Sequence, residues 1–223
     1  MDAVRCRVEG NDYVGAFLST TDRFTFAPLN LAKKNCDMIK KALGTEIVKI
    51  ALSGCDLIGL LCRANSGGVL LSNMVYDDEV EALKRSCPDM NVEVLESDLN
   101  AVGNNVLVND RICIINPDYS EKERKAIEDL MGVETVKAEN GGFKTVGANN
   151  ILTATGIALN NRTTDSEEEK FEKLTGFKGI RTTANMGGLS IGIACIANSR
   201  GMVSGYETTG FELNRIMEAL DNK

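Results

Sequence analysis

The sequence predicts an α/β fold in which five similar modules close into a ring, and three landmarks that recur in register predict it. A glycine preceded by an aliphatic residue recurs at spacings of 44, 44, 44 and 45 residues. A Thr or Asn stands six residues after each glycine, and a Val or Ile stands eleven or twelve residues before it. Self-similarity at a period of about 20–50 residues is typical of repeat architectures. The glycines are Gly15, Gly59, Gly103, Gly147 and Gly192.

Each module is expected to contain the same elements in the same order. A first strand leads from the glycine into a polar turn at the Thr or Asn, as in β-hairpins. Apolar runs predict a second strand at residues 24–26, 69–71, 112–115 and 157–159. A helix follows, and the Val or Ile landmark then marks a third strand. Three helix starts have the spacing of a capping box, namely Ser120 with Glu123, Ser166 with Glu169, and Thr209 with Glu212.

We expect one domain over residues 1–223, with repeats at approximately 11–54, 55–98, 99–142, 143–187, and 188–223 plus 1–10. The fifth helix, expected at about 209–220, has no third strand after it, whereas the N-terminus has a spare one. An open array would leave unpaired strand edges at both ends. The strand Val4–Val8 is therefore expected to fill the vacancy in the fifth module and close the ring.

The composition excludes several classes of function. The chain has no histidine, so Ser-His and Cys-His catalysis are excluded and the commonest metal ligand is missing. Seven cysteines without a Cys-x-x-Cys pair argue against a disulfide framework or a zinc site and fit the cytoplasm. A net charge of −7 disfavours binding mainly to nucleic-acid backbone. No apolar run of about 18 residues is present, so we expect no membrane span.

A ring of five strand–strand–helix–strand modules resembles the pentein architecture. The guanidino-modifying penteins use a cysteine nucleophile near the C-terminus, together with a histidine and carboxylates. Cys195 lies in the fifth module, but the chain offers no histidine to act as its base. We therefore expect Cys195 to be a small buried hydrophobe, and a pentein enzyme acting on guanidino compounds is the alternative.

The whole chain resembles the translation initiation factor 6 family, whose members prevent the association of ribosomal subunits. Four sets of residues carry the resemblance, in order and at module spacing. They are 54–59 with 64–71, 99–104 with 109–110, 183–185, and 205–213. The chain stops soon after the fifth helix and lacks the serine-bearing tail of the eukaryotic members, so it resembles the archaeal ones.

The resemblance implies a non-enzymatic factor that occupies the intersubunit face of the large ribosomal subunit and blocks the small one. Its implied partners are the ribosomal protein uL14, the neighbouring L24e-type protein and the sarcin–ricin loop. The family's Ala-Leu-Gly-Asn motif falls on residues 101–104, with Val102 in place of leucine, which implies ribosome binding by Asn104. Leu60 replaces an arginine of the eukaryotic members and suggests a more apolar contact. We expect a monomer.

Ring symmetry gathers the residues around the five glycines on one side, as a platform that includes Tyr13, Ala16 and Ala148. Glycine there is expected to let the backbone approach a partner closely. The implied ribosome-binding residues are Leu60, Gly103, Asn104, Asn105, Asn185 and Ser190. A ring-shaped scaffold for some other protein is a third interpretation, and binding to purified large subunits distinguishes the first from the others.

Overall fold

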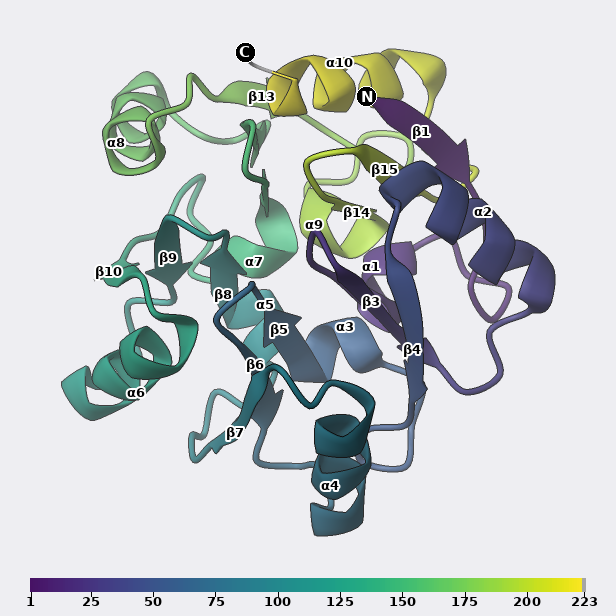
Figure 1. The fold of residues 1–223 in the computed structure, drawn as a ribbon. Helices are drawn as coiled ribbons and strands as arrows, with labels where there is room; N and C mark the ends of the chain where they lie inside the picture. The colour runs from purple at the N-terminus through teal and green to yellow at the C-terminus, as the bar shows by residue number, and fades with distance from the viewer. Residues whose placement is uncertain (222–223) are drawn as a thin grey trace.

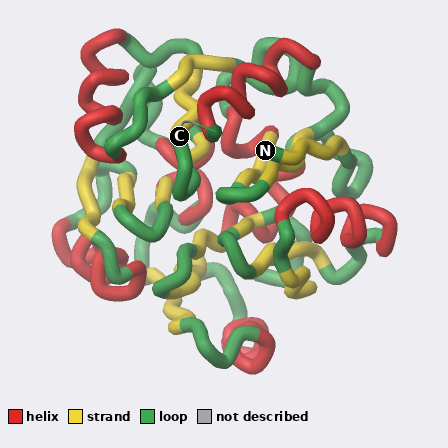
Figure 2. Tube along the Cα trace, turned by 45° about the horizontal axis from the view of Figure 1, so that its top comes forward, coloured by secondary structure: helices red, strands yellow, loops and turns green. Residues whose placement is uncertain are grey.

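The computed structural model describes residues 1–221, and in it five three-stranded sheets are arranged around one axis (Figure 1). Five long helices lie at the outside of this ring, and five one-turn helices lie near its centre. Figure 2 shows the same arrangement from a view turned by 45°. The α/β ring of five modules is therefore confirmed.

Each module runs in the order one-turn helix, strand, strand, long helix, strand. The one-turn helices are α1 (Val14–Phe17), α3 (Ile58–Leu61), α5 (Val102–Asn105), α7 (Val146–Asn149) and α9 (Ile191–Ala194). The first strands are β2 (Ser19–Thr20), β5 (Cys62–Ala64), β8 (Val106–Val108), β11 (Ile151–Leu152) and β14 (Cys195–Ala197). The second strands are β3 (Phe24–Pro28), β6 (Gly68–Ser72), β9 (Ile112–Ile115), β12 (Ile157–Asn160) and β15 (Gly201–Ser204). The long helices are α2 (Lys33–Leu43), α4 (Asp77–Ser86), α6 (Glu121–Met131), α8 (Asp165–Thr175) and α10 (Gly210–Leu220). The third strands are β4 (Glu46–Ile50), β7 (Asn91–Leu95), β10 (Glu134–Lys137), β13 (Ile180–Thr182) and, from the N-terminus, β1 (Asp2–Arg5).

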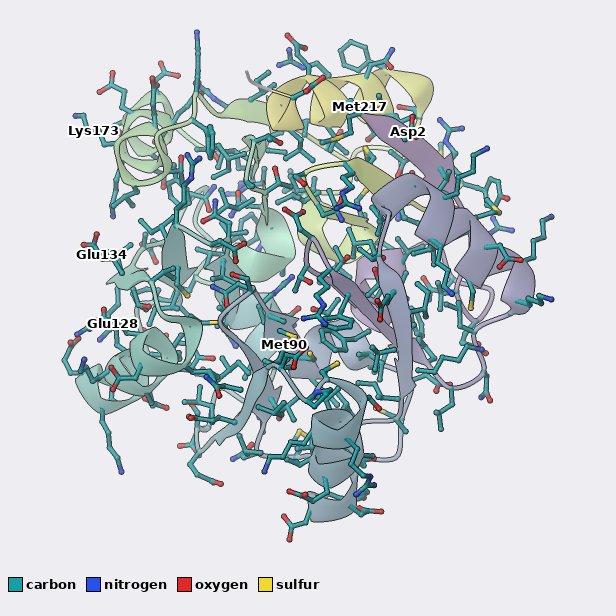
Figure 3. All side chains as sticks on the ribbon, in the orientation of Figure 1. Asp2, Met90, Glu128, Glu134, Lys173 and Met217 are labelled. Carbon is teal, nitrogen blue, oxygen red and sulfur yellow. The ribbon has the colours of Figure 1, made fainter. Side chains whose placement is uncertain are left out.

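The fifth sheet has the order β1-β15-β14, which matches β4-β3-β2 of the first module. The strand β1 pairs in parallel with β15, with Val4 opposite Val203, as every other third strand pairs with its second strand. Figure 3 shows Asp2 of β1 close to Met217 of α10, and Met217 packs in one hydrophobic cluster with Met1 and Ala3. The expected closure by the N-terminal strand is confirmed.

The expected bounds of that strand, Val4–Val8, are wrong. The strand ends at Arg5, and Val8 instead forms an isolated bridge with Asn11 across a tight turn. Glu9 and Gly10 occupy this turn with positive φ angles of 50° and 74°. The turn redirects the chain toward α1, so the strand must end before it.

The five glycines of the repeat, which we call the ring glycines, each lie at the start of a one-turn helix. The sequence analysis expected a strand to begin there. A Cβ atom added to Gly59 would lie 2.6 Å from the carbonyl oxygen of Leu18 and still closer to that of Gly15. The same relation joins Gly103 to Gly59, Gly147 to Gly103, Gly192 to Gly147, and Gly15 to Gly192. The five glycines therefore form a continuous ring of backbone contacts, and the repeat at about 44 residues reflects contact between neighbouring modules.

The Thr or Asn six residues after each glycine forms the expected hairpin turn, and each of the three asparagines also contacts the next module. The Oδ1 atom of Asn65 accepts hydrogen bonds from the backbone of Gly67 and Gly68 within its own turn. Its Nδ2 atom donates to the carbonyl of Asn109 in the third module, at 3.2 Å. Asn109 in turn donates to the carbonyl of Thr153, and Asn198 donates to that of Thr21. The second landmark thus serves both hairpin formation and ring assembly.

The hydrophobic core lies largely between modules. The cluster that contains Phe26 of β3 and Val48 of β4 continues into Ile58 and Leu71 of the second module. Likewise, Ile114 of the third module packs in one cluster with residues of the fourth. A single module therefore cannot bury its apolar face by itself, which is the general property of repeat folds.

Two of the three predicted capping boxes are confirmed, at Ser120 with Glu123 and at Thr209 with Glu212. The third is wrong, because α8 begins one residue before Ser166 and its capping box is Thr164 with Glu167.

The capping glutamates have a second role. Glu167 also accepts hydrogen bonds from the backbone of Gly141, which lies in the loop that precedes α7.

Glu212 anchors its loop in the same way. It accepts hydrogen bonds from the hydroxyl of Thr183 at 2.7 Å and from the backbone of Gly187 at 2.8 Å, besides those from Thr209. Burial alone would raise the pKa of the Glu212 carboxyl, but these hydrogen bonds outweigh burial and hold it below its ordinary value of 4.5. The ionised form is therefore favoured in the folded protein.

Replacing Glu212 by Gln is expected to reduce stability at neutral pH by about 1–3 kcal/mol, because buried donors lose an ionised acceptor. A carboxylate whose pKa is lowered by folding stabilises above its unfolded pKa, and this contribution is lost as pH falls through the folded value. The variant should consequently lose less stability than the parent chain when pH is lowered below 4.5. Urea unfolding at several pH values measures both effects. Glu218→Gln on the exposed side of α10 is the control, and equal results for both variants would contradict the prediction.

Candidate functional site

One end of the ring is formed by the one-turn helices and by the loops that lead into them. We call this surface the helix-end face, and it comprises residues 8–17, 52–61, 96–105, 140–149 and 184–194. The residues that the sequence implied for binding all lie within these segments. The structure separates them into two groups, according to whether the side chain reaches solvent.

Leu60, Asn104 and Ser190 are partly exposed. Asn104 is the second residue after Val102 in α5, and its backbone N–H donates to the carbonyl of Ala101 at 2.9 Å. Its side-chain amide has no hydrogen-bond partner within residues 1–221. An amide offers both donors and an acceptor, so Asn104 presents an unused hydrogen-bonding group. Ser190 is less free, since its hydroxyl donates to Asn149 at 3.2 Å.

Gly103, Asn105 and Asn185 are buried. Asn105 donates to the carbonyl of Ala101 at 3.0 Å and accepts from the Nδ2 atom of Asn116 at 2.8 Å. Asn185, which has a positive φ of 48°, donates to the carbonyl of Asp12 and accepts from the hydroxyl of Thr208. The Asn105 side chain is bonded within the third module, and the Asn185 side chain reaches the loop of the first module, so any contact that either makes with a partner requires rearrangement.

The expectation that the glycines bring backbone close to a partner is wrong for the ring glycines. The space beside each glycine is filled by a carbonyl of the preceding module, as described above. Ala16 and Ala148 are also buried, at 8% and 5% relative exposure. The platform is consequently narrower than ring symmetry alone suggests.

Two exposed apolar residues of this face were missed by the sequence analysis. Leu57 is 38% exposed and Met186 is 75% exposed, beside the expected Tyr13 at 41%. Tyr13 and Leu57 stand at the N-cap positions of α1 and α3 and make no capping hydrogen bond. N-cap positions usually carry Ser, Thr, Asp or Asn. A large apolar residue at such a position was therefore a sign in the sequence that the side chain is exposed on this face.

Acidic residues predominate in the loops around these apolar side chains. They are Glu9, Asp12, Asp56, Glu96, Asp98 and Glu139, against the two cations Arg7 and Lys144. Arg7 pairs with Asp12 at 2.9 Å, and Lys144 pairs with Asp118 of a neighbouring loop at 2.7 Å. The cations are thus neutralised, and the helix-end face combines exposed apolar groups with a negative rim.

Comparison with known proteins decides the family. The model of the eIF-6 family matches residues 3–219. The chain belongs to the eIF-6 family. It is 33% identical over 221 residues to translation initiation factor 6 of Saccharolobus islandicus, with 99% of each chain covered. It is 32% identical over 224 residues to translation initiation factor 6 of Pyrococcus horikoshii, again with 99% of each covered. The predicted resemblance is confirmed, and membership of the eIF-6 family makes the chain a translation initiation factor.

The cysteine that suggested the alternative function has no catalytic environment in this eIF-6 family member. Cys195 is 1% exposed, and burial raises the pKa of its thiol to about 12, with a smaller opposing effect of the Thr208 side chain. A reactive cysteine needs a lowered pKa and access to substrate. Its interpretation as a small buried hydrophobe is therefore confirmed.

No helix within residues 1–221 is both long and apolar enough to cross a membrane. Over the same residues, no three side chains of Cys, Asp or Glu are grouped so that they could hold a metal ion.

Proposed function

We propose that this protein binds the intersubunit face of the large ribosomal subunit through its helix-end face and thereby prevents association with the small subunit. The observation that carries the proposal is the unpartnered amide of Asn104 on a face with exposed Tyr13 and Leu57, partly exposed Leu60 and an acidic rim. Family membership supports the connection with translation initiation.

The charge of the helix-end face favours a protein partner over rRNA. Its acidic loops repel phosphate groups, whereas they complement basic ribosomal-protein surface and help to orient docking. We therefore propose uL14 as the principal contact, with the L24e-type protein and the sarcin–ricin loop close by. The apolar side chains supply buried area at the centre of such an interface. The protein acts as a cytoplasmic monomer and carries out no catalysis.

Sedimentation with purified ribosomal subunits tests this proposal. The protein should migrate with the large subunit and not with the small one, and it should reduce the formation of complete ribosomes when both subunits are mixed. Equal binding to both subunits would contradict the proposal. Binding to the large subunit without any effect on association would retain the partner and overturn the proposed action.

Asn104→Ser should weaken binding to the large subunit by about 1–3 kcal/mol, or roughly 5-fold to 150-fold in Kd, because an interfacial hydrogen-bond partner is left unsatisfied. Folding should be almost unchanged, since the Asn104 side chain has no partner among residues 1–221. The measurement combines thermal melting with titration onto large subunits.

The adjacent Asn105 supplies a matched control. Asn105→Ser removes two internal hydrogen bonds of a buried side chain, so it should lower the melting temperature and leave the affinity of the folded fraction nearly unchanged. If Asn104→Ser instead destabilises the fold, or if it binds as tightly as the parent chain, Asn104 is not an interface residue.

A further inference from the structure

Arg63 points into the central cavity of the ring from the middle of β5. The equivalent positions in the other four modules carry uncharged residues, Ser19, Leu107, Ile151 and Ile196. Arg63, Leu107, Ile151 and Ile196 line the same cavity, together with Thr20 and Asn150. The pseudosymmetry of the ring is therefore broken by a single cation at its axis.

The hydrogen bonds of the Arg63 guanidinium are incomplete. Its Nη2 atom donates to the carbonyl of Gly103 and, at 3.4 Å, to that of Gly147. Its Nε atom is buried and has no partner within residues 1–221, whereas Nη1 is not among the buried unpartnered atoms of these residues. The Arg63 side chain as a whole is partly exposed, so the donor that the protein encloses without an acceptor is Nε–H.

No carboxylate of residues 1–221 pairs with Arg63, although acidic residues outnumber basic ones in the chain. Asp22 and Asp110 line a neighbouring cavity at the turn end of the ring. Their carboxylates instead accept hydrogen bonds from the backbone of Ser199 and Ser66, at 2.8 and 2.7 Å. The positive charge of Arg63 therefore has no counter-charge from the protein.

The other polar side chains of the cavity are engaged elsewhere. Thr20 shares a hydrogen bond of 2.9 Å with Thr25, and Asn150 exchanges two hydrogen bonds of 2.9 Å with Asn140. Two backbone carbonyls offset part of the cost of removing the partly buried cation from water but do not neutralise it. The protein thus supplies neither a negative charge for Arg63 nor an acceptor for its buried Nε donor.

We propose that a small monovalent anion of the halide type occupies the central cavity and accepts a hydrogen bond from Nε of Arg63. A single cation matches a single negative charge. The apolar residues Leu107, Ile151 and Ile196 suit an anion that needs few donors, whereas phosphate needs more donors and more compensating charge.

The first test is anomalous diffraction from crystals of the full chain grown in bromide. A bromide peak within hydrogen-bond distance of Arg63 Nε is expected. A cavity that holds only water in this map, while bromide binds elsewhere on the surface, would overturn the proposal.

The second test is thermal melting in sodium bromide and in sodium gluconate at equal ionic strength. Bromide should raise the melting temperature by about 3–5 °C for each tenfold increase above its Kd, because it binds only the folded chain. Arg63→Met, which removes the charge and retains much of the volume, should abolish this difference between the salts. It should also melt above the parent chain in gluconate, since the unpaired charge is gone.

Arg85→Met, at an exposed position of α4, is the matched control and should keep the bromide response of the parent chain. A bromide response that survives in Arg63→Met would show that the effect arises at other sites and would reject the proposal. If Arg63→Met does not fold, the diffraction test on the parent chain decides the question.

Discussion

A chain that begins at residue 10 is expected to lose at least about 5 kcal/mol of stability, which is comparable with the whole stability of many domains. The deletion removes β1 and exposes the edge of β15, with which Asp2–Arg5 pairs. It also removes Cys6 and Val8, at 1% and 0% exposure, from the cluster shared by the first and fifth modules. Each large core truncation costs about 2–5 kcal/mol by itself. Urea unfolding followed by circular dichroism measures the loss.

A permuted chain provides the control for this deletion. The amino group of Met1 lies 3.7 Å from the carboxylate of Asp221, so the start of β1 is next to the end of α10. Residues 1–9 joined after Lys223 through a short Gly-Ser linker should then occupy the same place and restore most of the stability. The permuted fifth module would have the element order of the other four. Two results would contradict the prediction: unchanged stability after the deletion, or a permuted chain that remains as unstable as the deleted one. Either result would show that closure of the ring by β1 does not stabilise the fold.

Gly59→Ala is expected to cost about 3 kcal/mol or more, which is a large effect for the addition of one methyl group. The new Cβ would overlap the carbonyl groups of Gly15 and Leu18, and backbone cannot move aside as a flexible side chain can. Overpacking of a well-packed core costs about 1–3 kcal/mol, and this site lies at the upper end because its neighbour belongs to another module. Thermal and chemical unfolding measure the change.

Gly210→Ala is the matched control, because a Cβ at this position of α10 would have no atom within 4 Å. Alanine is favoured over glycine in a helix, so this variant should be as stable as the parent chain or slightly more stable. If Gly59→Ala is tolerated like Gly210→Ala, the glycine ring does not set the contact between modules. Because Gly103 lies in the same ring, its substitution should act first on folding and only indirectly on ribosome binding.

Much of the fold could be predicted from the sequence because it depends on local chemistry repeated five times. The run at residues 112–115 predicted β9 with its observed bounds, and Asn65, Asn109 and Asn198 form the expected hairpin turns. Apolar periodicity and turn residues act over a few neighbouring positions, so they can be recognised without tertiary contacts. The missing third strand of the fifth module also predicted which segment closes the ring.

The predictions from sequence that the structure contradicts concern details that depend on contacts between parts of the assembled ring. Ser166 and Thr164 both have residue types that suit the N-cap of a helix. In the structure the N-cap of α8 is Thr164, and Glu167 of its capping box also accepts a hydrogen bond from the backbone of Gly141. The glycine repeat was recognised, but its reason, five carbonyl groups packed against five glycines, exists only in the assembled ring. A motif match likewise cannot distinguish an exposed residue from a buried one.

The two asparagines of α5 show where the sequence by itself reached its limit. It determined the α/β modules, their number and the family to which the chain belongs, because these depend on pattern and order. Only the tertiary structure decided that Asn104 reaches the surface whereas Asn105 is bonded to Ala101 and Asn116, since one turn of helix directs the two identical side chains differently. It likewise decided that Arg63 faces the axis, because a cavity between five modules exists only once the ring has closed.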